Sequence, residues 1–458
     1  MPATGVVSTE GGLREVPPCP LGEEVLRWVV ERLWTQGVHR PTCKRLALLV
    51  GGLLETATVQ RGKLTAAVAR LQLSAATEPS IARRIERLLD DPQLDPERIV
   101  PSMTTALLPS LLAAVREAHA VSAAGDARAH GCWYPLLVLV DETTVRDAVH
   151  VLAAGLAYQG IAVPLGVRTW PQNVPLPPGE YWRHLHALLS DVQVALPPEL
   201  RDHVVLVADR GYGVPRMLDL AQALGWAWVL RLNGPTCLRL ADGRVIAASA
   251  LAPRPGTVAR HPGTLDDFLD AEEAAPDTPV AAFRTAGWRR CQVLAVWAED
   301  AAAPWLLATN LPGSRREFLI YARRWAIERL FLHWKSHGWD LELLQGPTPQ
   351  RVARLLTGMI LATHWVLARP PFGRRRIAHT AALLTAAAGS TTERQPLQQP
   401  HLPGCAPTPR DPRPAPAKRS LFTCVILRPI LLIGFTAKGR QGFTAKGRRE
   451  FTAKGRRQ

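Results

Sequence analysis

The side chains best suited to chemistry gather between residues 321 and 335, a stretch that reads as a helix. Counted from Tyr321 at 3.6 residues per turn, Arg324 points to about 300° and Glu328 to about 340°. Lys335 follows at about 320° on the same wheel. A phenol, a carboxylate and two cations on one narrow face suit a metal ion and a phosphate bound side by side. The alternative is a solvated helix face with an i,i+4 pair between Arg324 and Glu328.

The expected helix has recognisable signals at both of its ends. Ser314 and Glu317 form an S-x-x-E capping box just after a Pro-Gly dipeptide. Gly338 stands where a terminal glycine commonly ends a helix.

Two apolar runs upstream of this segment are each followed by an aspartate. Residues 136–140 and 204–208 are rich in Val and Leu, which is typical of strands buried on both faces. Asp141 follows the first run and Asp209 the second, so each is expected at the carboxyl end of a strand, where ligands bind in open α/β sheets. Either aspartate alone could equally cap a loop or a helix. Two strands and a helix that each present a carboxylate favour a shared site.

Three converging carboxylates fit a divalent metal site. Mg²⁺ prefers oxygen ligands, and it is usually held by a few carboxylates together with substrate phosphates. Two such ions can activate an attacking oxygen and stabilise a leaving oxygen. The neighbouring Arg and Lys side chains would neutralise phosphate.

Taken together, these pieces resemble the DDE transposases of the bacterial insertion-sequence class, family four. The signature Y-x2-R-x3-E-x6-K is complete in residues 321–335, and the motif Asp209-Arg-Gly-Tyr-Gly precedes it in the expected order. The resemblance covers residues 30 to 370, roughly, in order and spacing. It implies an RNase H-like catalytic core and cut-and-paste DNA transposition that depends on Mg²⁺ (or Mn²⁺).

The resemblance also implies roles for individual residues. Asp141, Asp209 and Glu328 would be the catalytic, metal-binding carboxylates. Contacts with DNA phosphates would fall to Arg210, Tyr321, Arg324 and Lys335. Related enzymes use an aromatic residue in a β-rich insertion to hold a flipped base, and Trp288 is the candidate here, with a place in the core as the alternative.

Composition agrees with a nucleic-acid partner. Lys and Arg number 55 against 39 Asp and Glu, a net charge of +16, and the pI is about 10.2. This favours a polyanion through phosphate neutralisation, although ribosomal and membrane-surface proteins share the signal. The seven cysteines are scattered without a C-x-x-C pair, so neither a zinc site nor a disulfide framework is indicated. With no signal-peptide run, we expect a cytoplasmic, nucleoid-associated protein without a membrane partner.

Periodicity and composition divide the chain into several parts. Residues 21–130 read as helices, and residues 80–89 form an amphipathic helix with a basic face. The core alternates expected strands (151–158, 161–169, 227–232, 305–309) with helices (181–196, 215–224), and a long helix is expected at 348–368. We therefore expect an α/β fold organised as follows: 1–20 leader; 21–130 helical DNA-binding region; 131–235 and 303–345 RNase H-like catalytic core; 236–302 β-rich insertion; 346–392 C-terminal helical region; 393–458 disordered tail with eight-residue repeats.

The tail repeats Phe-Thr-Ala-Lys-Gly-Arg from Phe435, Phe443 and Phe451 at a strict period of eight. Units this short, polar and basic cannot bury a core. Their near identity indicates translated tandem DNA repeats, and a basic DNA-binding tail is the alternative.

The sequence thus predicts a DNA transposase that cleaves phosphodiester bonds at transposon ends and transfers the strand into target DNA. Because two ends must be paired, we expect a dimer on double-stranded DNA. Two alternatives remain, namely a metal-dependent nuclease without strand transfer and a degenerate element copy that binds DNA without activity.

Overall fold

The computed structural model describes residues 5–7, 14–16, 20–124, 136–240, 242–258, 280–298, 301–312, 315–336 and 338–368. The tail with its repeats, residues 369–392 of the expected C-terminal helical region, more than half of the leader and Ser314 of the expected capping box lie outside these residues.

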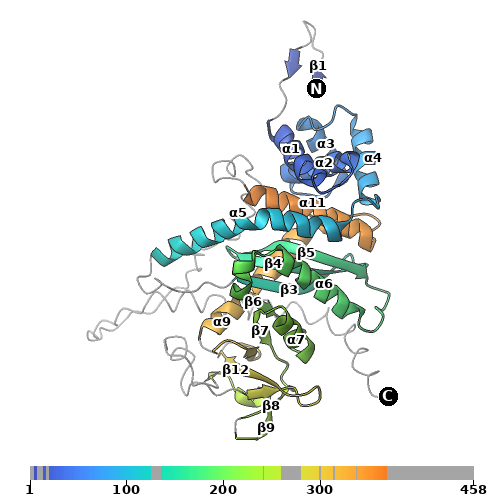
Figure 1. Cartoon of the computed structure of the whole chain (residues 1–458). Coiled ribbons are helices and arrows are strands. Elements are labelled where there is room, and N and C mark those ends of the chain that lie inside the picture. Colours follow the sequence, from blue (N-terminus) through green and yellow to red (C-terminus); the bar gives the residue numbers. More distant parts are fainter. Residues whose placement is uncertain are drawn as a thin grey trace, which may run out of the picture.

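A mixed β-sheet forms the centre of the described part of the molecule (Figure 1). Its strands follow the order β5-β4-β3-β6-β7-β13-β12-β11-β8-β9, and β10 pairs with β12. β3 pairs with β6 and β6 with β7 in parallel, whereas the β3–β4–β5 side and the β7–β13–β12 side are antiparallel. The first strands are β3 (Leu136–Val145), β4 (Val149–Tyr158), β5 (Ile161–Pro171), β6 (Val204–Ala208) and β7 (Ala227–Arg231). This mixed α/β architecture is consistent with the predicted RNase H-like core.

The region expected to be a β-rich insertion does contain strands, and they continue the central sheet. β13 (Trp305–Thr309) pairs with β7 on one side and with β12 (Arg289–Trp297) on the other. The remaining strands here are β8 (Cys237–Arg239), β9 (Val245–Ala247), β10 (Thr257–Val258) and β11 (Val280–Ala282). Two further short strands, β1 (Gly5–Val7) and β2 (Arg14–Val16), pair with each other near the N-terminus.

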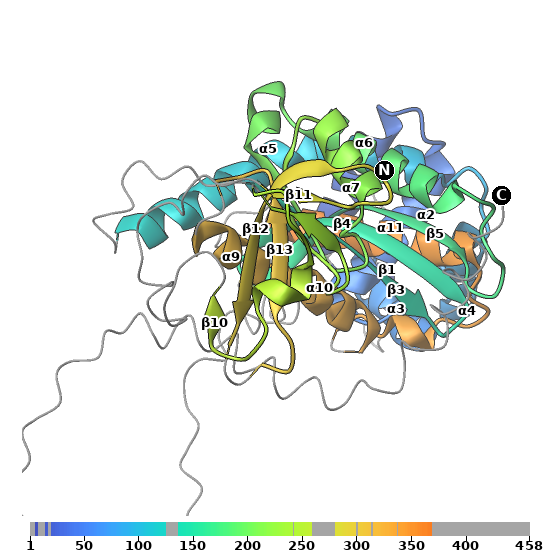
Figure 2. The same ribbon diagram turned by 90° about the horizontal axis from the view of Figure 1, so that it is seen from below.

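Helices cover both faces of the sheet. The helices are α1 (Pro20–Trp34), α2 (Arg40–Thr56), α3 (Arg61–Arg70), α4 (Glu78–Leu89), α5 (Pro96–Ala124), α6 (Glu180–Ala195), α7 (Pro215–Ala223), α9 (Arg315–Ala322), α10 (Trp325–Lys335) and α11 (Pro349–Leu367). Three 3-10 turns complete the list, η1 (Pro198–His203), η2 (Ala248–Leu251) and η3 (Leu341–Leu343). One apolar core joins the sheet to α10, α11 and the N-terminal helices, and the other joins it to α6 and α7 (Figure 2). None of the helices in the described ranges is long and apolar enough to cross a bilayer.

Strand alternation assigns the residues of β3 and β6 to these two cores. Leu137 and Leu139 of β3 belong to the core shared with α10, together with Val205 and Val207 of β6. Val138 and Val140 belong to the core shared with α6 and α7. Because successive side chains point to opposite faces, the residues that follow continue the same alternation.

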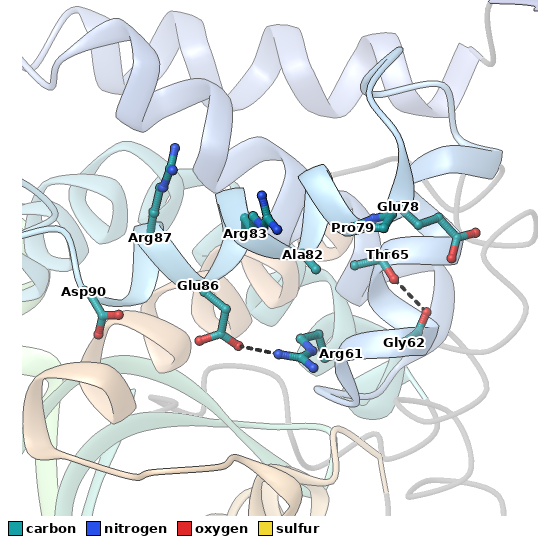
Figure 3. A pocket seen from close by; sticks show the side chains of 10 residues that line it. All are labelled: Arg61, Gly62, Thr65, Glu78, Pro79, Ala82, Arg83, Glu86, Arg87 and Asp90. Carbon is teal, nitrogen blue, oxygen red and sulfur yellow. Dashed lines mark hydrogen bonds and ion pairs between the residues drawn. The ribbon is translucent and has the colours of Figure 1, made fainter.

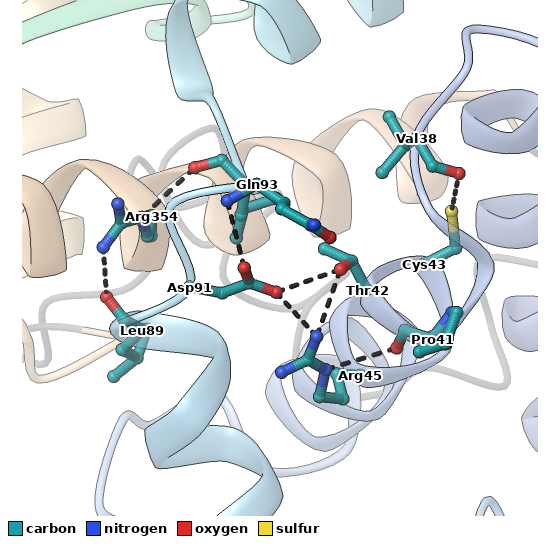
Figure 4. A network of polar contacts seen from close by, with 10 residues as sticks. Val38, Pro41, Thr42, Cys43, Arg45, Leu89, Asp91, Gln93 and Arg354 are labelled. Carbon is teal, nitrogen blue, oxygen red and sulfur yellow. Dashed lines mark hydrogen bonds and ion pairs between the residues drawn. The ribbon is translucent and has the colours of Figure 1, made fainter.

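The N-terminal helices are tied to α11 by arginine side chains. Arg351 contacts Glu86 at 2.5 Å and Asp90 at 2.7 Å, and both partners belong to α4 or its C-terminal cap. Arg354 donates to the carbonyl oxygens of Leu89 at 2.8 Å and Leu94 at 3.1 Å (Figure 4). We call these contacts of Arg351 and Arg354 with the end of α4 the α4–α11 clamp.

A second polar network lies beside the clamp and joins α2 to the segment after α4. Asp91 accepts hydrogen bonds from Thr42 at 3.0 Å, from Arg45 at 2.6 Å and from the Gln93 amide at 3.0 Å (Figure 4). Since Asp91 is buried, these donors offset the cost of removing its charge from water.

Candidate active site

β3 and β6 bring Asp141 and Asp209 side by side. Val140 and Ala208 form the last registered pair of this parallel ladder, and the two aspartates are the next residues. The prediction that the first strand stops at residue 140 was wrong, because its antiparallel ladder with β4 continues as far as Val145. Asp141 therefore lies inside β3, at the point where pairing with β6 stops, while Asp209 starts a turn.

The turn that holds Asp209 explains the glycines of its motif. One carboxylate oxygen of Asp209 accepts the Gly211 amide at 2.7 Å, and its carbonyl oxygen accepts the Tyr212 amide at 3.0 Å. A Cβ on Gly213 would lie 2.1 Å from the carbonyl oxygen of Arg231, so only glycine lets the turn pass this close to β7.

Glu328 reaches the site from α10, and the single helix predicted for residues 321–335 is wrong. α9 ends at Ala322 and α10 begins at Trp325. The amides of Arg323 and Arg324 bond to carbonyls three residues back instead of four, which tightens the chain between the helices. The two helices rest on different strands, α9 on β6 and β7 and α10 mainly on β3 and β5, so the axis changes between them.

The expected end signal at Gly338 is also wrong, since α10 ends at Lys335 with Ser336 as its cap. Gly338 does not take a left-handed conformation. It lies against the ring of His333, where a Cβ would come within 2.4 Å, so close approach accounts for the glycine.

Arg324 lies in the break between α9 and α10, and its side chain is at the centre of the candidate site. Its Nη2 donates to Glu328 Oε1 at 2.7 Å, and its Nη1 lies 3.5 Å from Asp141 Oδ2. The ring of Tyr321 lies 5.8 Å from the guanidinium carbon, and the buried Tyr321 hydroxyl lies near it without a hydrogen bond of good geometry. Tyr321, Arg324 and Glu328 thus share one place, as the sequence predicted.

The electrostatics show how closely the carboxylates converge. Burial raises the pKa of Asp141 to about 7, the negative charges of Asp209 and Glu328 add to the rise, and Arg324 opposes it. Burial and the two other carboxylates together outweigh the effect of Arg324 on the pKa of Asp141. Perturbed groups of this kind are typical of functional sites.

Lys335 and Arg210 lie at the margins of the cluster. Lys335 Nζ lies 3.4 Å from Glu342 Oε1, and the other oxygen of Glu342 accepts the Arg146 amide at 2.8 Å at the tip of the β3–β4 hairpin. The side chain of Arg210 is exposed just after Asp209, and its carbonyl oxygen accepts a hydrogen bond from Asn233.

The structure does not bring Trp288 to the carboxylates. The strand pairings between β6, β7, β13 and β12 place Asp209 at the same level of the sheet as Leu294. Trp288 comes six residues before Leu294 in β12 and the segment that leads into it. Since β12 runs in the same direction as β6, Trp288 lies toward the opposite edge of the sheet. Its ring is half-buried and faces the guanidinium of Arg239 at 5.0 Å.

Sequence reasoning missed three residues on the far side of β3. Glu142 follows Asp141 directly, and the hydroxyls of Tyr181 and Tyr212 meet at 3.0 Å on that side. Tyr212 lies inside the motif that begins at Asp209, which was an available signal. Nothing in the sequence singled out Tyr181.

One comparison with known proteins matches the chain. The family model described as the transposase DDE domain matches residues 183–365. This match supports a DDE transposase. It covers Asp209 and the whole signature from Tyr321 to Lys335, and it begins after Asp141. The narrower insertion-sequence family stays a prediction, and no curated protein matches the chain.

Proposed function

We propose that the protein is a DNA transposase that cleaves phosphodiester bonds at transposon ends and joins the freed 3′-hydroxyl to target DNA. The observation that carries the proposal is the cluster around Arg324, where carboxylates from β3 and α10 meet beside the Asp209 turn. The match to the transposase DDE domain supports the same reaction.

The donor set fits divalent metal ions. Asp141, Asp209 and Glu328 supply carboxylate oxygens, the ligand type that Mg²⁺ and Mn²⁺ prefer. In the described residues no three His, Cys, Asp or Glu side chains are close enough to hold a metal, and Arg324 lies between two of the three carboxylates. Because the guanidinium of Arg324 pairs with Asp141 and Glu328, the space between these carboxylates favours a positive charge.

Each residue of the cluster then has a separate task. The three carboxylates would hold the ions, which when bound activate the attacking oxygen and stabilise the leaving oxygen. Arg324 would present its planar fork to a DNA phosphate, with the Tyr321 hydroxyl beside it. Lys335 and the exposed Arg210 would contact phosphates further along the DNA backbone.

The N-terminal helices offer a second place for DNA. A groove of about 600 Å³ lies between α3 and α4 (Figure 3). Its charged lining residues are Arg61, Arg83, Arg87, Glu78, Glu86 and Asp90. The side chains of Arg83, Arg84 and Arg87 on α4 are exposed. These residues support the proposal that α4 contacts transposon-end DNA, and paired ends would require a dimer on DNA.

The test uses a labelled duplex that carries the DNA ends flanking this gene, with a supercoiled plasmid as target. With Mg²⁺ or Mn²⁺, the wild-type protein should nick the duplex at the transposon end and join it to the plasmid. Asp141→Ala, Asp209→Ala and Glu328→Ala should each lose at least 10³-fold in cleavage, on the order of several kcal/mol of transition-state stabilisation, and should still shift the duplex in a gel.

The control is Asp219→Ala, which removes an exposed carboxylate of α7 that pairs with Arg289 at 2.8 Å. This variant should cleave like the wild type. Cleavage without joining would assign the protein to the metal-dependent nucleases. Full cleavage by any of the three site variants, or binding without cleavage by the wild type, would refute the proposal.

A further inference from the structure

The end of β3 presents carboxylates to both faces of the sheet. Asp141 follows the alternation of Leu137 and Leu139, and its contact with Arg324 places it on the α10 face. Glu142 follows Val138 and Val140, so it projects toward the face that α6 and α7 cover. The neighbouring carboxylates of Asp141 and Glu142 therefore lie on opposite faces of the sheet.

A pair of tyrosines lies on the face toward which Glu142 projects. The hydroxyl of Tyr181, in the first turn of α6, donates to the hydroxyl of Tyr212 at 3.0 Å. Tyr212 is buried, and the ring of Tyr181 makes edge contacts with Trp170 and Trp182 at 5.8 Å between ring centroids. The pair thus joins α6 to the turn that follows β6.

Both hydroxyls remain protonated beside the carboxylates. Burial is the first cause that raises the pKa of Tyr181, and the charges of Glu142, Asp141 and Asp209 add to the rise. Burial likewise raises the pKa of Tyr212, with Tyr181, Glu142 and Asp141 as further causes.

The position of Tyr212 connects this pair to both aspartates. Its amide bonds to the carbonyl oxygen of Asp209 at 3.0 Å, so it ends the turn that fixes Asp209. Glu142, whose charge contributes most among the carboxylates to the raised pKa of Tyr181, is the neighbour of Asp141 in β3. The hydroxyl pair is therefore joined to the turn that holds Asp209 through the backbone of Tyr212.

We infer that Tyr181 and Tyr212 are positioning residues that fix the turn of Asp209, and with it the position of Asp209 beside Asp141, from the face opposite Arg324. This inference rests on the proposed function. Groups that orient metal ligands without touching the metal commonly change metal affinity by about 10–100-fold when removed. The pair would act on metal affinity more than on the chemistry of the loaded site.

The experiment measures Mn²⁺ binding by electron paramagnetic resonance and calorimetry on the full chain without DNA, then cleavage against Mn²⁺ concentration. Tyr212→Phe and Tyr181→Phe should each weaken Mn²⁺ binding by about 10-fold or more. Cleavage should return to near the wild-type rate at saturating Mn²⁺. Tyr158→Phe, which removes a hydroxyl of a buried tyrosine at the distal end of β4, should bind Mn²⁺ like the wild type.

Several outcomes would overturn the inference. Wild-type Mn²⁺ affinity in both folded tyrosine variants would show that the pair is only structural, as would a lowered melting temperature with unchanged affinity. Should Tyr212→Phe fail to fold, the half-buried Tyr181→Phe decides alone. Failure of the proposed function itself looks different, because Asp141→Ala would then bind Mn²⁺ as tightly as the wild type.

Discussion

Arg324 and Arg351 each lie between two carboxylates, and their surroundings differ. Arg324 joins Asp141 and Glu328, and the exposed fractions of the three side chains are 8%, 16% and 22%. Arg351, in the α4–α11 clamp, joins Glu86 and Asp90, with exposed fractions of 17%, 38% and 60%. An arginine thus pairs with two carboxylates in a largely buried site at Arg324 and near the surface at Arg351.

The difference in exposure shows in which of the two clusters the negative charges are less well compensated. Around Arg324 a third carboxylate, that of Asp209, acts on Asp141, and a single guanidinium does not offset the combined burial and repulsion. Around Arg351 the carboxylates keep contact with water, which screens their repulsion. Because the carboxylates around Arg324 disfavour the ionisation of Asp141, a bound cation would stabilise the ionised form. The contacts of the α4–α11 clamp instead hold the two helices together.

The largest contrast should appear in cleavage. Arg324→Ala should lower the rate of end cleavage by on the order of 10²-fold, as expected when an oriented group that stabilises developing charge is removed. Arg324→Lys should not restore it, because the planar fork is lost. Arg351→Ala is the matched control, since it also removes an arginine from between two carboxylates, and it should cleave at nearly the wild-type rate.

These rates would be measured on the labelled end duplex, beside thermal melting of each variant. Near wild-type cleavage by Arg324→Ala would show that the contacts of Arg324 with Asp141 and Glu328 are ion pairs that take no part in cleavage. Equal losses in Arg324→Ala and Arg351→Ala would remove the distinction between the two clusters.

The second contrast concerns the dependence of stability on pH in the absence of metal. Since the folded pKa of Asp141 is about 7 and its ordinary value is 3.8, the folded state binds its proton more tightly than the unfolded state. The stability that the neutral carboxyl contributes is complete below about pH 4 and is lost as the pH rises through 7. Asp141→Asn keeps a neutral side chain at every pH, so its advantage over the wild type should grow across this window to on the order of a few kcal/mol, at about 1.4 kcal/mol per pKa unit.

Urea unfolding in a chelator from pH 4 to pH 8 would measure this difference. Asp219→Asn should show almost no change over this range, because the hydrogen bond from Arg289 lowers the pKa of Asp219 from its ordinary value of 3.8, so that its titration lies below pH 4. The stability that Asp219 contributes is present above the ordinary pKa and is lost as the pH falls through the lowered value. A pH-independent difference for Asp141→Asn would show that the carboxylates do not repel one another in the folded protein.

Much of the fold could be predicted from residue patterns. The expected strands at 151–158, 161–169, 227–232 and 305–309 and the helices at 181–196, 215–224 and 348–368 are confirmed to within about two residues. These elements carry strong apolar periodicity and are bounded by Gly, Pro or polar residues, so local signals were sufficient. α3 was not predicted individually, because its apolar face is short and its first turn is basic.

The sequence predicted part of the grouping in the candidate site, whereas the path of the backbone between the grouped residues could not be predicted. The grouping of Tyr321, Arg324 and Glu328 follows from near-helical spacing, which survives the break between α9 and α10. The break itself depends on which strands each helix packs against, and that is a tertiary property. The same holds for Trp288, since no local pattern states the direction of β12, and for Tyr181, whose partner is 31 residues away in sequence.

A smaller effect is expected at Lys335. Its ammonium group lies beside Glu342 in the free protein, so it must leave this partner to reach a DNA phosphate. Lys335→Ala should weaken binding of the end duplex and should lower the slope of log affinity against log salt by about one. Glu342→Gln, which releases Lys335 but can still accept the Arg146 amide, should bind at least as tightly as the wild type. An unchanged salt slope in Lys335→Ala would exclude the phosphate contact.

The smallest effect should come from breaking the clamp. Arg351→Ala removes contacts to two carboxylates that remain partly in water, so the loss of stability should be about 1 kcal/mol. For a chain of this size the melting temperature should fall by roughly 1 °C. A double-mutant cycle with Glu86→Gln would isolate the pair, because Arg351 also contacts Asp90 and its single replacement reports on both. If the coupling energy of the Arg351–Glu86 pair reached that of the Arg324–Glu328 pair, measured in the same way, then burial would not distinguish the two clusters. A small coupling in the clamp beside a large one at Arg324 would show that burial strengthens the ion pairs of Arg324 relative to those of Arg351.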